Sequence, residues 1–261
     1  MVSRDGRRLL VANYGMGEGG PDRSVSVFDI RPDGGLTPSV ASVRQLDATG
    51  PIKGRQERSH AHSVTELIGG GLAVVADLGN DTLTTYRLQP QGALEEIAVS
   101  STAPGAGPRH VALHPDGELL FLMNELDSTV SSFRLDRASG VLTQLDAQLA
   151  VPAEAQATNH CADIQISPDG RFIYGSNRGH DSVSCFAVDA SSGKLSLVGF
   201  FPCGGSTPRN LAITPSGRYL FSANQNADRV SIFFRDAETG KLADTGRAIE
   251  VGTPMCVKFS T

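Results

Sequence analysis

An internal repeat of about 50 residues constrains the fold of this chain more than any other feature. Residues 108–124, 161–177 and 208–224 align without a gap. In each segment a Pro, a small polar residue and a Gly stand at the same offset, and an Asn follows nine residues after the Pro. A Val comes six residues beyond that Asn, and an aromatic residue comes nine beyond it. Two weaker copies precede these three, so the equivalent anchor positions are Asn13, Asp77, Asn124, Asn177 and Asn224.

Each copy is typical of four short β-strands. Two apolar or alternating runs flank a Pro-Asp-Gly or Pro-Ser-Gly turn, a third alternating run follows a polar turn, and a Gly-Xaa-Leu element closes the unit. No segment shows a helical period. Four-stranded units of this length predict an all-β fold, a β-propeller with five blades in a single domain over residues 1–261. A β-sandwich ranks far behind, because it would need about seven strands without such a repeat.

The two ends of the chain complement each other. Residues 253–259 match the first strand of a unit, whereas the N-terminus starts at a turn and a second strand. We therefore expect the C-terminal strand to join the N-terminal blade and close the ring, which would remove exposed sheet edges.

Composition and charge narrow the function classes. The net charge is −5 with no basic block, which disfavours nucleic acid as a partner. No run approaches the roughly 18 apolar residues of a membrane helix, and charges occupy the place of a signal peptide's apolar stretch. The four cysteines (Cys161, Cys185, Cys203 and Cys256) form no C-x-x-C pair, so neither a zinc ribbon nor a redox motif is indicated. We expect a cytoplasmic monomer that binds neither a metal nor a cofactor.

Candidate functional residues are those that occur in only one or two units. The repeated anchor Asn residues are interpreted as turn caps. His62 lies at the start of a first strand, Arg109 and Arg209 hold comparable places in later units, and Glu125 follows the anchor Asn in the third unit alone. In a propeller these positions converge on one mouth of the central channel, which is the usual place for a ligand. Two guanidinium groups beside a titratable His and Glu suit a small anionic ligand.

Several strings resemble one known family. They are Ser59-His-Ala-His-Ser63, Gly107-Pro-Arg-His110 with Asn124-Glu-Leu126, Ala162-Asp-Ile164 and Thr207-Pro-Arg209. The chain resembles the lactonase family of β-propellers, which includes propeller-type 6-phosphogluconolactonase and the fungal enzyme that cyclises carboxy-cis,cis-muconate. The family's members have seven blades, and the likeness starts partway into the third, so we expect about two N-terminal blades to be missing from this sequence. The resemblance implies a site of His62, Arg109, Glu125 and Arg209, which binds an acidic lactone or phosphosugar or the hydroxy-acid product.

The implied activity is hydrolysis of 6-phosphogluconolactone to 6-phosphogluconate, a step of the pentose phosphate pathway. Opening a lactone needs a base that activates water and a group that stabilises an oxyanion. His62 is the candidate base, and Arg109 and Arg209 can bind a carboxylate or phosphate or face the oxyanion. Glu125 is expected either to protonate the leaving alkoxide or to orient an Arg. Further substrate-binding candidates are His110, Asn124, Arg178 and Asp163.

Other interpretations of the same residues remain open. His62 could be a packed strand residue, and the two Arg residues could bridge blades through carbonyl groups or Asp163. A metal pair of His60 and His62 is geometrically possible but lacks a third ligand nearby. At the level of function, the alternatives are a non-catalytic propeller that binds partners and a cycloisomerase that acts on a muconate-type diacid. Neither a G-x-S-x-G elbow nor a P-loop occurs.

Overall fold

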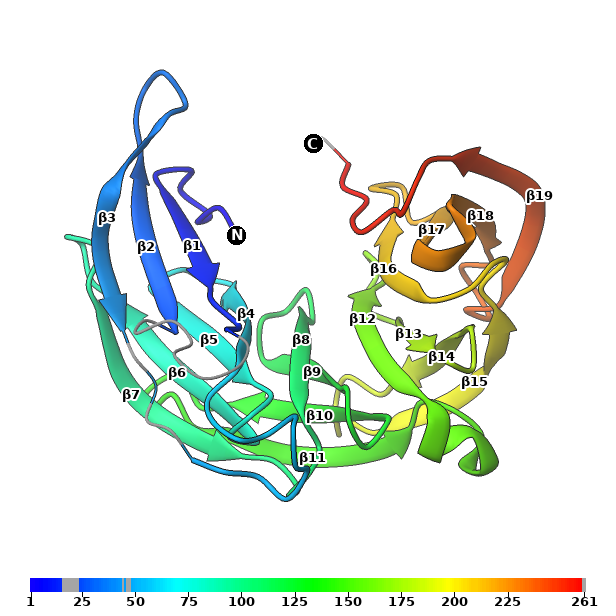
Figure 1. Ribbon diagram of the computed structural model, residues 1–261, viewed down its shortest axis with the longest axis horizontal. Coiled ribbons are helices and arrows are strands. Elements are labelled where there is room, and N and C mark those ends of the chain that lie inside the picture. Colours follow the sequence, from blue (N-terminus) through cyan, green and yellow to red (C-terminus); the bar gives the residue numbers. More distant parts are fainter. Residues whose placement is uncertain (16–23, 44, 46–47, 260–261) are drawn as a thin grey trace. The chain divides into compact units, whose positions relative to one another are not determined.

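The computed structural model describes residues 1–15, 24–43, 45 and 48–259. The chain divides into two compact units (Figure 1). Unit 1 comprises Met1–Val111 and Leu135–Thr143, and unit 2 comprises Ala112–Arg134 and Gln144–Thr261. The single domain expected over residues 1–261 stays a prediction.

The described strands form five antiparallel sheets, in the order of the repeat. The first sheet contains β1 (Arg8–Ala12), β2 (Val25–Ile30) and β3 (Leu36–Val43). The second contains β4 (Ala61–Glu66), β5 (Leu72–Asp77), β6 (Thr82–Leu88) and β7 (Leu94–Ser101). The third contains β8 (Pro108–Leu113), β9 (Leu119–Asn124), β10 (Thr129–Leu135) and β11 (Leu142–Leu149). The fourth contains β12 (His160–Ile166), β13 (Phe172–Arg178), β14 (Ser182–Val188) and β15 (Leu195–Pro202), and the fifth contains β16 (Pro208–Ile213), β17 (Tyr219–Asn224), β18 (Arg229–Arg235) and β19 (Leu242–Glu250).

These sheets confirm the predicted all-β propeller fold of five blades. Four sheets have the expected four strands and the first has three. The anchor residues Asp77, Asn124 and Asn224 each end the second strand of their sheet. Among the described residues, the helical segments are two 3-10 turns, η1 (Ala153–Thr158) and η2 (Gln225–Ala227). No helix in the described part of the chain is long and apolar enough to cross a membrane.

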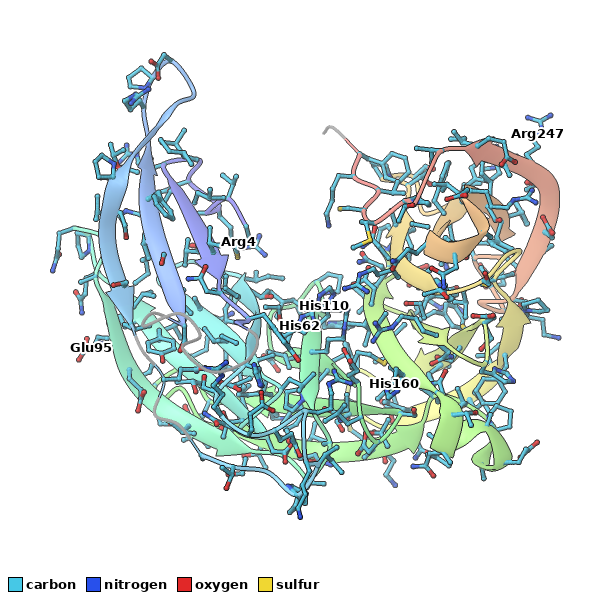
Figure 2. All side chains as sticks on the ribbon, in the orientation of Figure 1. Arg4, His62, Glu95, His110, His160 and Arg247 are labelled. Atoms are coloured by element: carbon cyan, nitrogen blue, oxygen red, sulfur yellow. The ribbon has the colours of Figure 1, made fainter. Side chains whose placement is uncertain are left out.

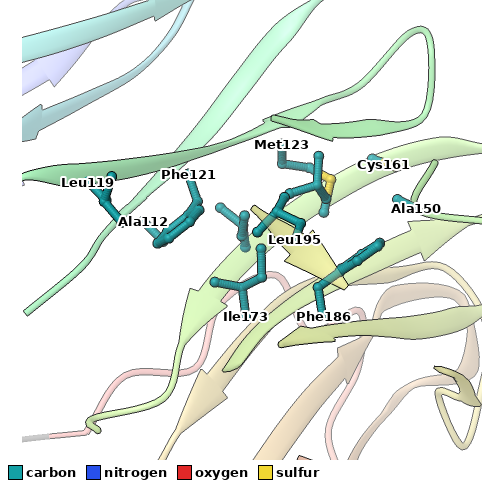
Figure 3. Close-up of a cluster of buried hydrophobic side chains, with 11 residues drawn as sticks. Ala112, Leu119, Phe121, Met123, Ala150, Cys161, Ile173, Phe186 and Leu195 are labelled. Atoms are coloured by element: carbon teal, nitrogen blue, oxygen red, sulfur yellow. The ribbon is translucent and has the colours of Figure 1, made fainter. Parts of the chain in front are cut away.

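The second strands supply much of the core. β5 and β9 are buried at every residue, whereas the fourth strands β7 and β11 carry many exposed residues. In unit 2 a cluster of buried side chains packs between the third and fourth sheets, with Phe121 and Met123 from β9 against Ile173 and Phe186 (Figure 3). Burying such side chains is the main stabilising contribution in a fold of this kind.

A left-handed residue stands four positions after four of the anchors. These residues are Asp81, Ser128, Asp181 and Asp228, with φ between 50° and 57°. In three cases the carboxylate accepts a backbone N–H at the place where the next copy of the repeat begins. Asp81 accepts from Gly107 at 2.8 Å, Asp181 from Thr207 at 2.8 Å and Asp228 from Thr253 at 2.7 Å. Asp and Asn tolerate this backbone region better than other non-glycine residues, which accounts for the residue choice.

The last of these contacts corrects the expected closure of the ring. Residues 253–259 form no strand, and the first sheet contains only β1, β2 and β3. Asp228 instead holds Thr253 within unit 2, Asn210 Oδ1 accepts the Val257 N–H at 2.7 Å, and the Phe259 ring meets Phe221 at 5.2 Å. The C-terminal segment is therefore fixed beside β16 by the sheet that precedes it.

Candidate functional site

The predicted site residues fall into two groups, one in each unit. The histidine group, in unit 1, consists of Tyr14, His60, His62, Arg109 and His110. The arginine group, in unit 2, consists of Glu125, Arg178, Arg209 and Gln225. Each group is held together by contacts of its own, and the four residues implied by the family resemblance divide evenly between them.

His62 is the residue around which the histidine group is built. Its ring meets the ring of His110 edge-on, with the centroids 5.1 Å apart (Figure 2). The His62 ring also meets the ring of Tyr14, with the centroids 5.5 Å apart and an interplanar angle of 80°. Arg109 is buried, with 2% of its surface exposed, and its Nη1 lies 3.3 Å from His110 Nε2. The structure thus brings together three predicted site residues, His62, Arg109 and His110.

A β-bulge sets the direction of His62. The pairing of β4 with β5 passes from Ala61 opposite Asp77 directly to Ser63 opposite Ala76, so His62 is the extra residue. Arg209 is the extra residue of an equivalent bulge, because Pro208 pairs with Asn224 and Asn210 with Ala223. An extra residue re-aims its side chain out of the regular alternation, and such bulges are frequent beside functional sites. Two of the predicted site residues therefore share one local backbone device.

His60 contacts protein acceptors with both ring nitrogens. Nδ1 lies 3.1 Å from the Tyr14 carbonyl oxygen and 3.0 Å from that of Gly15, and Nε2 lies 3.1 Å from Glu57 Oε1. The ring also stacks on Tyr14, with centroids 4.6 Å apart. A nitrogen that donates a hydrogen bond has no lone pair for a metal ion, so this geometry weighs against the His60–His62 metal pair.

Asp77 fixes the start of β4 through hydrogen bonds. Its carboxylate is fully buried and accepts the backbone N–H of His60 at 2.7 Å, the Ser59 hydroxyl at 2.5 Å and the Gly79 N–H at 2.9 Å. Burial raises the pKa of Asp77 above its usual value, and these hydrogen bonds act in the opposite direction. The other four copies of the repeat have Asn at this anchor position, and Asp77 is the exception that lies behind the histidine group.

The raised pKa of Asp77 predicts a pH dependence of stability. The folded chain binds this proton more tightly than the unfolded chain, so the contribution of Asp77 to the unfolding free energy is greatest in acid and falls as pH rises from about 4. Asp77→Asn keeps the shape and the acceptor for His60 but cannot ionise. We expect the variant to gain stability relative to wild type between pH 4 and 7, measured by urea unfolding at each pH. A difference that stayed constant with pH would contradict this assignment.

The arginine group contains a buried ion pair. Glu125 is 5% exposed, and its Oε2 lies 3.0 Å from Arg178 Nη2. Arg178 also donates from Nε to the His160 carbonyl at 3.2 Å and from Nη2 to the Cys161 carbonyl at 2.8 Å. The Glu125 carboxylate and the Arg178 guanidinium are therefore in direct contact at the centre of this group.

Arg209 is the second cation of this group. Its Nη1 donates a long hydrogen bond, 3.4 Å, to Gln225 Oε1, and it forms no ion pair with any carboxylate that the structure describes. Partial burial first, and then the positive charge of Arg178, lower the pKa of its guanidinium from the usual value. Two cations beside one carboxylate leave an excess of positive charge, which suits an anionic ligand.

Two predicted substrate-binding residues have structural contacts instead. Asn124 Nδ2 donates to Thr129 Oγ1 at 2.9 Å and to Ser131 Oγ at 3.2 Å, within its own sheet. Asp163 Oδ2 accepts from Asn210 Nδ2 at 2.6 Å and from the Leu211 N–H at 2.9 Å, which links the fourth sheet to the fifth. A role for either residue in substrate binding stays a prediction.

Tyr14 and Gln225 belong to these groups, yet the sequence did not single them out as site residues. Both directly follow an anchor Asn, as Glu125 does, so the position itself carried a signal. The type of residue there differs from copy to copy, which hides the signal from a search for repeated residues.

Comparisons with known proteins agree with this fold. The family described as "Lactonase, 7-bladed beta-propeller" matches residues 1–259. A 6-phosphogluconolactonase of Bacillus subtilis is 35% identical over 202 residues, which cover 77% of this chain and 55% of that protein. A 6-phosphogluconolactonase of Formosa agariphila is 35% identical over 217 residues, which cover 81% and 59% of the two chains. The chain thus spans less than two thirds of the length of these relatives.

A solved structure gives the same result for the fold. The periplasmic gluconolactonase PpgL of Pseudomonas aeruginosa superposes with a TM-score of 0.90 at 36% identity, covering 100% of this chain and 72% of that one. The repeat, the five sheets and the match over residues 1–259 lead to one conclusion. The chain belongs to the lactonase family of seven-bladed β-propellers.

Proposed function

We propose that this protein hydrolyses a sugar lactone, and that the substrate is 6-phosphogluconolactone. The observation that carries the proposal is Arg209, a guanidinium without a described carboxylate partner beside the Glu125–Arg178 ion pair. Such a group can bind the phosphate of the substrate or the carboxylate of the product bidentately. The 6-phosphogluconolactonases among the relatives support the same choice of substrate.

In the proposed reaction, water attacks the lactone carbonyl carbon and the ring C–O bond breaks. His62 takes a proton from the attacking water and returns it to the leaving alkoxide, which becomes a hydroxyl group, and the new carboxylic acid loses its proton to solvent. The guanidinium of Arg109, which lies beside His110 in the same unit as His62, stabilises the oxyanion that forms on the carbonyl oxygen. The products are a carboxylate and an alcohol on the same open chain.

Glu125 fits an orienting role in this scheme better than an acid role. Its carboxylate contacts the Arg178 guanidinium at 3.0 Å, which is the geometry of a charge-assisted pair that fixes both side chains. Arg178 is in turn fixed by two backbone carbonyl groups. We therefore assign Glu125 and Arg178 to a rigid pair that positions positive charge beside Arg209.

The pentose phosphate pathway follows from the proposed substrate, and the cytoplasmic location stays a prediction from sequence. Purified protein assayed with freshly generated 6-phosphogluconolactone tests the proposal. Turnover no faster than spontaneous hydrolysis would overturn it. Parallel assays with a non-phosphorylated gluconolactone and with a muconate-type diacid separate the substrate classes. Binding of partner proteins without any turnover would favour the non-catalytic alternative.

Arg209→Ala is expected to raise KM for the phosphorylated lactone by about 10- to 100-fold, because it removes a charge-assisted bidentate contact of roughly 1.5–3 kcal/mol. The loss should be much smaller for the non-phosphorylated lactone if Arg209 binds phosphate. Arg218→Ala is the matched control, since Arg218 is an exposed Arg of the same sheet that stacks on Tyr219. Equal KM values for Arg209→Ala and wild type would remove Arg209 from the site.

A further inference from the structure

We propose that Tyr14 is a positioning residue for His62 and that His60 holds Tyr14 in place. This inference rests on the proposed function for its catalytic part, since it concerns the candidate base. Four rings of unit 1 contact one another in sequence: His60 stacks on Tyr14, Tyr14 meets His62, and His62 meets His110.

His60 contacts both the ring and the main chain of Tyr14. The two rings are nearly parallel, with centroids 4.6 Å apart and an interplanar angle of 19°. His60 Nδ1 also lies within 3.1 Å of the carbonyl oxygens of Tyr14 and Gly15. One side chain therefore fixes both the path of this segment and the plane of the Tyr14 ring.

His60 is itself held from every side. It is 2% exposed, its backbone N–H donates to Asp77 Oδ1 at 2.7 Å, and its carbonyl accepts the Leu78 N–H at 3.0 Å. Its Nε2 faces Glu57 Oε1 at 3.1 Å. A side chain with this many partners has little rotamer freedom, so it can act as a rigid support.

Tyr14 and His110 both contact His62. The ring centroids lie 5.5 Å and 5.1 Å away, and both pairs have the edge-to-face geometry that aromatic rings favour. His62 occupies a bulge, where the regular sheet pairing does not fix its side chain. The two neighbouring rings supply that constraint, and a base must be oriented before it can take a proton from a bound water.

The test uses Tyr14→Ala, Tyr14→Phe and His60→Ala, with Tyr219→Ala as a control tyrosine in unit 2. The Cε1–H resonance of His62 is assigned by its loss in His62→Gln and then followed by NMR. We expect Tyr14→Ala and His60→Ala to move this resonance and to lower kcat about 10-fold with KM changed less than about twofold. Tyr14→Phe keeps the ring and should restore both readouts, and Tyr219→Ala should move neither.

Two results would overturn the inference. One is a His62 resonance that stays unchanged in Tyr14→Ala, and the other is a Tyr14→Phe variant as impaired as Tyr14→Ala. If Tyr14→Ala does not fold, as judged by its melting curve, Tyr14→Leu replaces it with the same expected outcomes. The NMR readout needs no turnover, so an inactive wild type would overturn the proposed function while leaving the positioning of His62 to be decided by the resonance.

Discussion

His62→Ala is expected to lower kcat/KM for lactone hydrolysis by about 10²- to 10⁴-fold, the usual contribution of a general base. The variant removes the imidazole. The bulge between Ala61 and Ser63 is a feature of the backbone pairing, so it is expected to stay in place. Because the base acts in the chemical step, the loss should fall on kcat more than on KM. Initial rates with freshly generated 6-phosphogluconolactone, corrected for spontaneous hydrolysis, measure it.

The control for this variant is His180→Ala. His180 is also a partly buried histidine, but it lies in a loop where its Nδ1 contacts Ser182 Oγ at 2.7 Å. We expect its activity to stay within twofold of wild type. Full activity in His62→Ala would show that another group takes the proton. The double variant His62→Ala with Arg109→Ala addresses the prediction that both residues act on one substrate, since strongly non-additive losses are the mark of residues that act as a unit.

Gly79 packs behind the histidine group, against Arg58 and His60. Of the single-methyl additions that affect this packing, Gly79→Ala is expected to cause the largest loss of stability. A Cβ at this position would lie 1.7 Å from the backbone oxygen of Arg58 and 2.9 Å from His60 Cδ2. A backbone oxygen cannot rotate away, so the chain before β4 must shift. Overpacking of this kind costs about 1–3 kcal/mol, and we expect the upper end of that range. Thermal unfolding monitored by circular dichroism measures it.

Gly252→Ala is the matched control. A Cβ there would meet no atom within 4 Å, and the residue has no left-handed φ. Its melting temperature should stay within about 1 °C of wild type, because surface changes of this kind stay within about 0.5 kcal/mol. Equal melting temperatures for the Gly79 and Gly252 variants would mean that the segment around Arg58 moves freely. That result would contradict the close packing of Gly79 against Arg58 and His60.

Periodicity made the fold accessible from sequence. Because every copy repeats the same turn and the same apolar runs, an error in one copy is corrected by the others, and the five sheets emerge at the expected places. The first sheet is the exception, since its expected fourth strand was assigned by likeness to Thr207–Ile213 alone. Likeness identifies the kind of segment but not its partner, and Asp228 and Asn210 decide the partner here.

The candidate site was accessible only in part, for the opposite reason. His62, Arg109, Glu125 and Arg209 stand out because they break the repeat, and position within a copy then groups them. The contacts that give each of them a role are not periodic. The Glu125–Arg178 ion pair joins different sheets, and the stacking of His60 on Tyr14 joins residues 46 positions apart. A bulge of one residue at His62 leaves no trace in residue type either.

The left-handed aspartates that follow the anchors bear on how such a chain can grow. Asp81, Asp181 and Asp228 each belong to one sheet but fasten the backbone where the following copy starts. A duplicated copy of the repeat would therefore carry the aspartate that bonds to the backbone of the next copy. No new contact would have to evolve at the junction between the copies. Tandem duplication could lengthen the array one copy at a time, with the joint inherited along with the sheet.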